Sequence, residues 1–84
     1  MMQKYFHFTI TCDARRQIPK MILERLVDEY VWQGSESARG TVSVRERAKR
    51  VQQLILAEID RRKGHREFEK LLARICQENL EQSG

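Results

Sequence analysis

Cysteine is scarce in this sequence, and long apolar runs are missing from it. The two cysteines, Cys12 and Cys76, lie far apart and form no CxxC pair, so we predict reduced, buried thiols and no disulfide framework. The longest apolar runs, at 21–23 and 54–57, fall far short of the roughly 20 residues of a membrane-spanning helix. Polar residues interrupt the first segment, so it does not resemble a secretory signal. These absences predict a cytoplasmic protein without a membrane partner.

The residue patterns of catalysis and metal binding are also missing. Beside the carboxylates, the candidate metal ligands are His7, Cys12, His65 and Cys76. None of them falls at the short spacings that zinc sites use. No glycine-rich loop follows an apolar strand, and no hydroxyl or thiol stands beside a base in a recognisable motif. We therefore expect no metal, no cofactor and no enzymatic activity.

Charged and apolar residues are both abundant. Charged residues make up 33% of the chain and hydrophobic residues 40%, a balance that suits a folded domain. A chain of 84 residues has room for one core, so residues 1–84 are expected to form a single domain, only marginally stable by itself. The net charge of +4 favours an anionic partner such as nucleic acid.

Residues 4–12 show a strict alternation of apolar and polar side chains. The apolar positions are Phe6, Phe8, Ile10 and Cys12. The polar side carries Tyr5, His7, Thr9 and Thr11. A period of two with aromatic and β-branched residues predicts a half-buried β-strand over 4–12.

A first helix is predicted over 18–33. Apolar residues recur there at spacings of three and four, and Pro19 suits the first turn because proline has no amide proton to leave unpaired. Gly34 is expected to end this helix. The segment 34–42 is rich in glycine and serine and lacks periodicity, which predicts an exposed loop.

Two further helices are predicted in the second half of the chain. Ser43 and Glu46 have the spacing of a capping box, which predicts the start of a basic amphipathic helix over 43–63. Gly64 separates it from a C-terminal helix over 65–81. In that helix Phe68, Leu71, Leu72 and Ile75 form an apolar stripe.

A lone strand leaves its backbone donors and acceptors without partners. Two arrangements solve this. The strand of one chain can pair with that of a second copy, which gives a mainly α fold of order β-α-α-α in a homodimer. Alternatively, residues 40–45 form a second strand within the chain, which gives a compact α+β domain of order βαβα.

The alternating strand and the segment Gly40-Thr41-Val42-Ser43-Val44-Arg45-Glu46-Arg47 together resemble the ribbon-helix-helix family of DNA-binding repressors, which includes the methionine, Arc and CopG repressors. In that family the entry to the second helix consists of a glycine, a small hydroxyl residue and a Ser-x-Glu-like helix start. The resemblance covers roughly 4–62, apart from a longer loop between the helices, and the C-terminal helix is an addition to the family pattern. It implies a homodimer whose paired strands enter the major groove of double-stranded DNA.

The resemblance also implies roles for individual residues. The outward strand side chains, which would read bases, are Tyr5, His7, Thr9 and Thr11. The residues that would bind phosphate at the start of the second helix are Thr41, Ser43, Arg45, Arg47 and Lys49. The expected function is that of a dimeric repressor or accessory factor in transcription regulation.

Two other interpretations stay open. The polar side of the strand could simply face water, and the basic run at 45–50 could be a solvated helix face. The chain could also be a protein-interaction module, an inhibitor or adaptor of a mobile element or bacterial regulatory system. Its docking surface would then be Phe68, Leu71, Leu72 and Ile75. Every interpretation shares one expected core, formed by Phe8, Ile10, Leu26, Val51 and Ile55.

Overall fold

The fold is all-helical in the part of the chain that the computed structural model describes, which is the backbone of residues 7–83 and the side chains of 7–78. The elements are α1 (Thr11–Gln17), a 3-10 turn (Ile18–Lys20), α2 (Leu23–Arg39), α3 (Val42–Arg62) and α4 (His65–Ser83). No strand occurs between residues 7 and 83. The predicted β-α-α-α fold class is therefore wrong, and so is the βαβα alternative.

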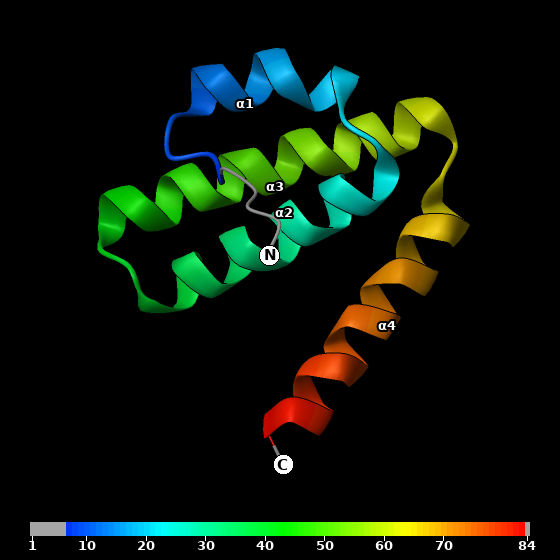
Figure 1. The fold of residues 1–84 in the computed structure, drawn as a ribbon. Coiled ribbons are helices and arrows are strands. Elements are labelled where there is room, and N and C mark those ends of the chain that lie inside the picture. The colour runs from blue at the N-terminus through cyan, green and yellow to red at the C-terminus, as the bar shows by residue number, and fades with distance from the viewer. Residues whose placement is uncertain (1–6, 84) are drawn as a thin grey trace, which may run out of the picture.

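The longest helix, α3, lies in the middle of the domain (Figure 1). It forms an antiparallel hairpin with α2, and α1 lies along its other side, while α4 crosses at a steep angle and packs mainly on α2. The shared core contains the fully buried side chains of Leu26, Val51 and Ile55, as predicted. Phe8 packs at the edge of this core, but Ile10 is 55% exposed, so its predicted burial is wrong.

The segment predicted as a strand is an extended lead into α1. The backbone N–H of Phe8 donates to Glu29 Oε2 at 2.9 Å, and Gln33 Nε2 donates to the Phe8 carbonyl at 2.7 Å. Two side chains one turn apart on α2 thus satisfy the two backbone groups that a neighbouring strand would have bonded. From Thr11 the chain turns helical because Ala14 and Ile18, four residues apart, both enter the core.

Helix α2 continues past Gly34 to Arg39, so the predicted helix end at 33 and the predicted loop over 34–42 are wrong. A Cβ at Gly34 would lie 3.0 Å from Gln52 Nε2, so glycine leaves room for this side chain, which donates to the Tyr30 carbonyl at 3.0 Å. The packing of the whole of α2 on α3 outweighs the roughly 1 kcal/mol that glycine costs inside a helix. The turn itself comes at Gly40, where a Cβ would lie 2.8 Å from the Glu36 carbonyl oxygen and closer still to Val44.

The start of α3 differs from the predicted capping box. The N-cap is Thr41, whose hydroxyl accepts a hydrogen bond from the Val44 N–H at 3.5 Å, whereas Ser43 lies inside the first turn. The last turn ends with Lys63 in the left-handed region, at φ 56°, and Gly64 N–H donates to the Ile59 carbonyl at 3.0 Å. This six-to-one bond closes the helix as in a Schellman motif, and it separates α3 from α4.

The two hydroxyl residues at this helix start are expected to differ in their effect on stability. Thr41→Ala should lower the free energy of unfolding by about 0.5–1 kcal/mol because it removes the cap. Ser43→Ala should change it by less than about 0.5 kcal/mol. Urea denaturation followed by circular dichroism measures both variants, and a larger loss for Ser43→Ala would restore the capping-box interpretation.

Candidate functional site

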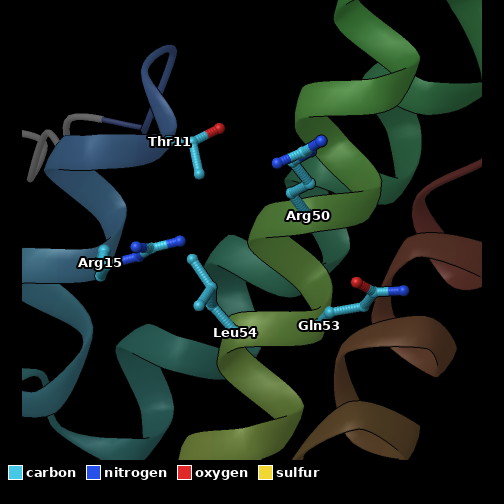
Figure 2. A pocket seen from close by; sticks show the side chains of 5 residues that line it. All are labelled: Thr11, Arg15, Arg50, Gln53 and Leu54. Atoms are coloured by element: carbon cyan, nitrogen blue, oxygen red, sulfur yellow. The ribbon is translucent and has the colours of Figure 1, made fainter.

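A groove between α1 and α3 is the candidate site. It has a volume of about 350 Å³ and is lined by Thr11, Arg15, Arg50, Gln53 and Leu54. Figure 2 shows the side chains of Arg15 and Arg50 reaching into it from the two facing helices. The hydroxyl-bearing side chain of Thr11 points toward Arg50 from the beginning of α1. The groove therefore presents two guanidinium groups and a hydroxyl to one ligand.

Helix periodicity explains why the arginines lie here. On α1 the neighbours of Arg15 in the core are Ala14 and Ile18, which pull that face of the helix inward and leave Arg15 at the rim. On α3, Val51 and Ile55 are fully buried, and Arg50 precedes them on the adjacent face. The core packing of the two helices thus positions their basic rims opposite each other.

The electrostatics of the groove favour an anion. No carboxylate lines it, and neither Arg15 nor Arg50 forms an ion pair with another residue of the described chain. Some other arginines are paired locally, as Arg16 is through its Nη2, 3.3 Å from Asp13 Oδ1. Arginine is always protonated and offers a fork of donors that matches phosphate and carboxylate oxygens.

A second hollow of about 260 Å³ continues the groove, since Arg15 and Leu54 line both. Its other lining residues are Ile18, Pro19, Ala57, Glu58 and Arg61. Glu58 accepts hydrogen bonds from Arg61 and Arg62, and these arginines lower the pKa of its carboxyl to about 2 although burial opposes them. Arg62 also donates to the carbonyls of Ile18 and Pro19, which ties the 3-10 turn to α3.

The four predicted base-reading residues do not form one outward row. Tyr5 lies outside the described residues. His7 faces inward, where its ring stacks on Trp32 with centroids 4.3 Å apart and its Nδ1 lies 2.9 Å from Glu29 Oε1. Thr9 is exposed on a bend, and only Thr11 reaches the groove. The strand that was to align them is absent from residues 7–12, so their common role has lost its basis.

His7 belongs to a polar cluster centred on Glu29, whose side chain is fully buried. Besides His7 and the Phe8 N–H, Arg25 donates to Glu29 at 2.9 Å and Gln33 at 2.7 Å. Burial by itself would raise the pKa of Glu29, but the hydrogen bonds outweigh it and hold the pKa below its usual value. This cluster fastens the N-terminal segment to α2 and has a structural role.

The predicted phosphate-binding residues lie on the first two turns of α3, in two groups. Thr41, Ser43, Arg45 and Lys49 are exposed. Arg47 instead turns toward α2, where its Nη2 lies 3.6 Å from Glu36 Oε1 and its guanidinium is 5.8 Å from the centre of the Trp32 ring. The exposed group is therefore free for an anionic partner, whereas Arg47 already serves the fold.

Arg15, Gln53 and Leu54 were missed by the sequence analysis as groove residues, and Arg50 was treated only as part of a basic run. A usable signal existed. The spacing of Ala14 and Ile18 is helical, and a helix there places Arg15 beside a buried face. The alternation over 4–12 concealed this helix because it made residues 11 and 12 part of a strand.

The apolar stripe of α4 packs within the domain. Phe68 is buried and meets Tyr30 edge to face at 5.4 Å between ring centroids, and Leu71, Leu72 and Ile75 pack against the core. Phe68 is therefore covered by the domain itself, whereas Leu71, Leu72 and Ile75 stay partly exposed. Cys12 and Cys76 are free and exposed, so their predicted burial is wrong.

No family model matches this chain, and neither curated proteins nor solved structures show a match to it. The resemblance to ribbon-helix-helix repressors is therefore untested by comparison. None of the helices in the described part of the chain has the length and apolar character needed to cross a membrane. The same residues contain no group of three His, Cys, Asp or Glu side chains suited to a metal ion.

Proposed function

We propose that this domain binds DNA through its phosphates and that the groove between α1 and α3 is the principal contact. The observation that carries this proposal is the pair Arg15 and Arg50, two guanidinium groups without ion-pair partners in the described chain that enter one groove from facing helices. Phosphate contacts supply most of the affinity of nonspecific DNA binding. The net charge of +4 supports the same partner.

The exposed basic residues of α3 extend this surface. Lys49 directly precedes Arg50, Arg45 lies five residues before it, and both are exposed on the same helix. A strand of DNA that contacts the groove can therefore meet further positive charge along the helix. Glu46 is the one acidic residue in this stretch, so the positive charge predominates.

The test is a salt titration of DNA binding by the double variant Arg15→Gln/Arg50→Gln. Fluorescence anisotropy with a mixed-sequence duplex should show affinity weakened about tenfold at low salt. The slope of log affinity against log salt should become shallower by about two, because two fewer counterions are released from DNA.

A matched control is Arg66→Gln/Lys70→Gln, which removes the same charge from exposed positions on α4. It should retain most of the affinity and of the salt slope. If both double variants weaken binding equally, net charge and not the groove is responsible. If the unmodified protein binds no DNA even at low salt, the proposal fails.

The mode of DNA binding proposed here differs from a paired ribbon, which requires a strand. Homodimer formation and a role in repression stay predictions that no comparison addresses. The alternative of a protein-interaction module also stays a prediction, although Phe68 of its docking stripe is buried in the domain and Leu71, Leu72 and Ile75 are partly buried. Light scattering of the purified protein, alone and with DNA, measures the oligomeric state directly.

A further inference from the structure

We infer that the groove holds one unpaired nucleotide, with its phosphate on Arg15 and Arg50 and its base in the adjoining apolar hollow. This inference rests on the proposed function and narrows it from DNA in general to single-stranded or locally unpaired DNA. Its ground is the juxtaposition of two hollows of opposite character that share Arg15 and Leu54.

The two hollows follow one face of α3. Arg50, Leu54 and Ala57 are spaced by four and then three residues, so they line up along the helix. The rise of an α-helix places Arg50 and Ala57 about 10 Å apart along the axis. The groove and the adjoining hollow thus form one continuous trough. Its polar part is followed by its apolar part, as the phosphate is followed by the base in one nucleotide.

The chemistry of the two parts differs sharply. The first hollow is lined by the polar side chains of Thr11, Arg15, Arg50 and Gln53. Their hydrogen-bond donors suit an anion or another polar group. The second contains the apolar side chains of Ile18, Pro19, Leu54 and Ala57. A ligand that fills both needs a compact anionic group attached to a flat group with apolar faces.

The one carboxylate in the trough does not oppose such a ligand. Glu58 is bonded to both Arg61 and Arg62, so the three side chains together carry a positive charge. Arg61 itself lines the apolar hollow, and its side chain is 66% exposed to solvent. The local field therefore stays favourable to phosphate along the whole trough.

The base has to be unpaired for this fit. In a duplex each base is stacked on both faces and paired at its edge, and only a base that leaves the stack can enter a protein hollow. Proteins that bind single strands combine a positively charged groove with surfaces that contact the bases. The trough between α1 and α3 has this combination on a small scale.

The test compares three labelled DNA probes of one length in anisotropy titrations, a mixed-sequence single strand, its duplex and an abasic single strand. The natural strand should bind about fivefold more tightly than the abasic strand, the gain expected from burying one base face. It should also bind more tightly than the duplex. Ala57→Leu, which fills the hollow from an exposed helical position, should abolish the difference between natural and abasic strands.

Ala73→Leu is the control, since it makes the same change at an exposed position of α4 and should leave the difference intact. Circular dichroism verifies that both variants fold. Equal binding of natural and abasic strands, or of single strand and duplex, would overturn the inference. Displacement of the strand by an equal concentration of an acidic peptide would also overturn it, because the groove would then select only charge.

The variant Arg15→Gln/Arg50→Gln separates the two proposals. Suppose that the double variant binds both the natural and the abasic strand more weakly than the unmodified protein does, and that the unmodified protein binds the two strands equally well. Phosphate binding by the groove is then supported, and the pocket for the base is refuted. If the double variant binds neither strand more weakly, the proposed function itself is refuted.

Discussion

Replacing Glu29 with alanine is expected to lower the free energy of unfolding by about 3–5 kcal/mol, the usual cost of removing one partner from a buried ionic cluster. Glu29 is fully buried and accepts hydrogen bonds from the Phe8 N–H, Arg25 and Gln33, with His7 Nδ1 at 2.9 Å. The substitution leaves these groups without their shared acceptor. Native domains have a total stability of about 5–15 kcal/mol, and a chain of 84 residues is expected near the lower end of that range, so this loss would remove most of its stability.

Guanidinium denaturation followed by far-ultraviolet circular dichroism measures this loss. Glu69→Ala is a suitable control because Glu69 is exposed on α4, and it should cost less than about 0.5 kcal/mol. Glu29→Gln should be intermediate, since an amide oxygen can still accept hydrogen bonds but carries no charge. A Glu29→Ala variant as stable as the control would show that the cluster does not hold the N-terminal segment.

Acidification is expected to have a comparably large effect on stability. The hydrogen bonds and charge of Arg61 and Arg62 lower the pKa of Glu58 to about 2 in the folded protein, from an ordinary value of 4.5. A carboxyl whose pKa falls on folding stabilises the fold above its unfolded pKa. That contribution should be complete above about pH 4.5 and should be lost progressively as the pH falls toward 2. Glu29 acts in the same direction, because its folded pKa is also lowered.

The unfolding midpoint in urea, measured from pH 7 down to pH 2, should therefore fall steeply below pH 4.5. Glu58→Gln should be less stable than the unmodified protein at pH 7, and the gap between them should narrow with acid because both side chains are then uncharged. Glu69→Gln should keep the steep profile. A Glu58→Gln variant with the same profile as the unmodified protein would exclude this carboxyl as a source of acid sensitivity.

The helical pattern of the second half of the chain was readable from the residues alone. Apolar side chains at spacings of three and four predicted helices over 43–63 and 65–81, and the structure has α3 at Val42–Arg62 and α4 at His65–Ser83. Leu26, Val51 and Ile55 are buried as expected. These features depend on local periodicity and on the break at Gly64, which short stretches of sequence contain in full.

The structure of residues 7–40 depends on partners far away in the chain. The alternation over 4–12 suits a strand, but a strand needs another backbone beside it, and Glu29 and Gln33 satisfy Phe8 instead. A glycine at position 34 is typical of a helix end, yet α2 packs along α3 and continues to Arg39. In each case a contact across more than fifteen residues outweighed a local preference of about 1 kcal/mol.

For the candidate site, too, the sequence predicted one part and the tertiary contacts decided the other. The residues themselves determined a basic, helix-rich domain with a net charge of +4, and that charge already indicated an anionic partner. Only the tertiary structure decided which cations are available. Packing turns Arg47 toward Glu36 and Trp32, and it brings Arg15 and Arg50, which are 35 residues apart in the sequence, into one groove. Charge is a property of single residues, whereas a binding site is a property of the distances between them.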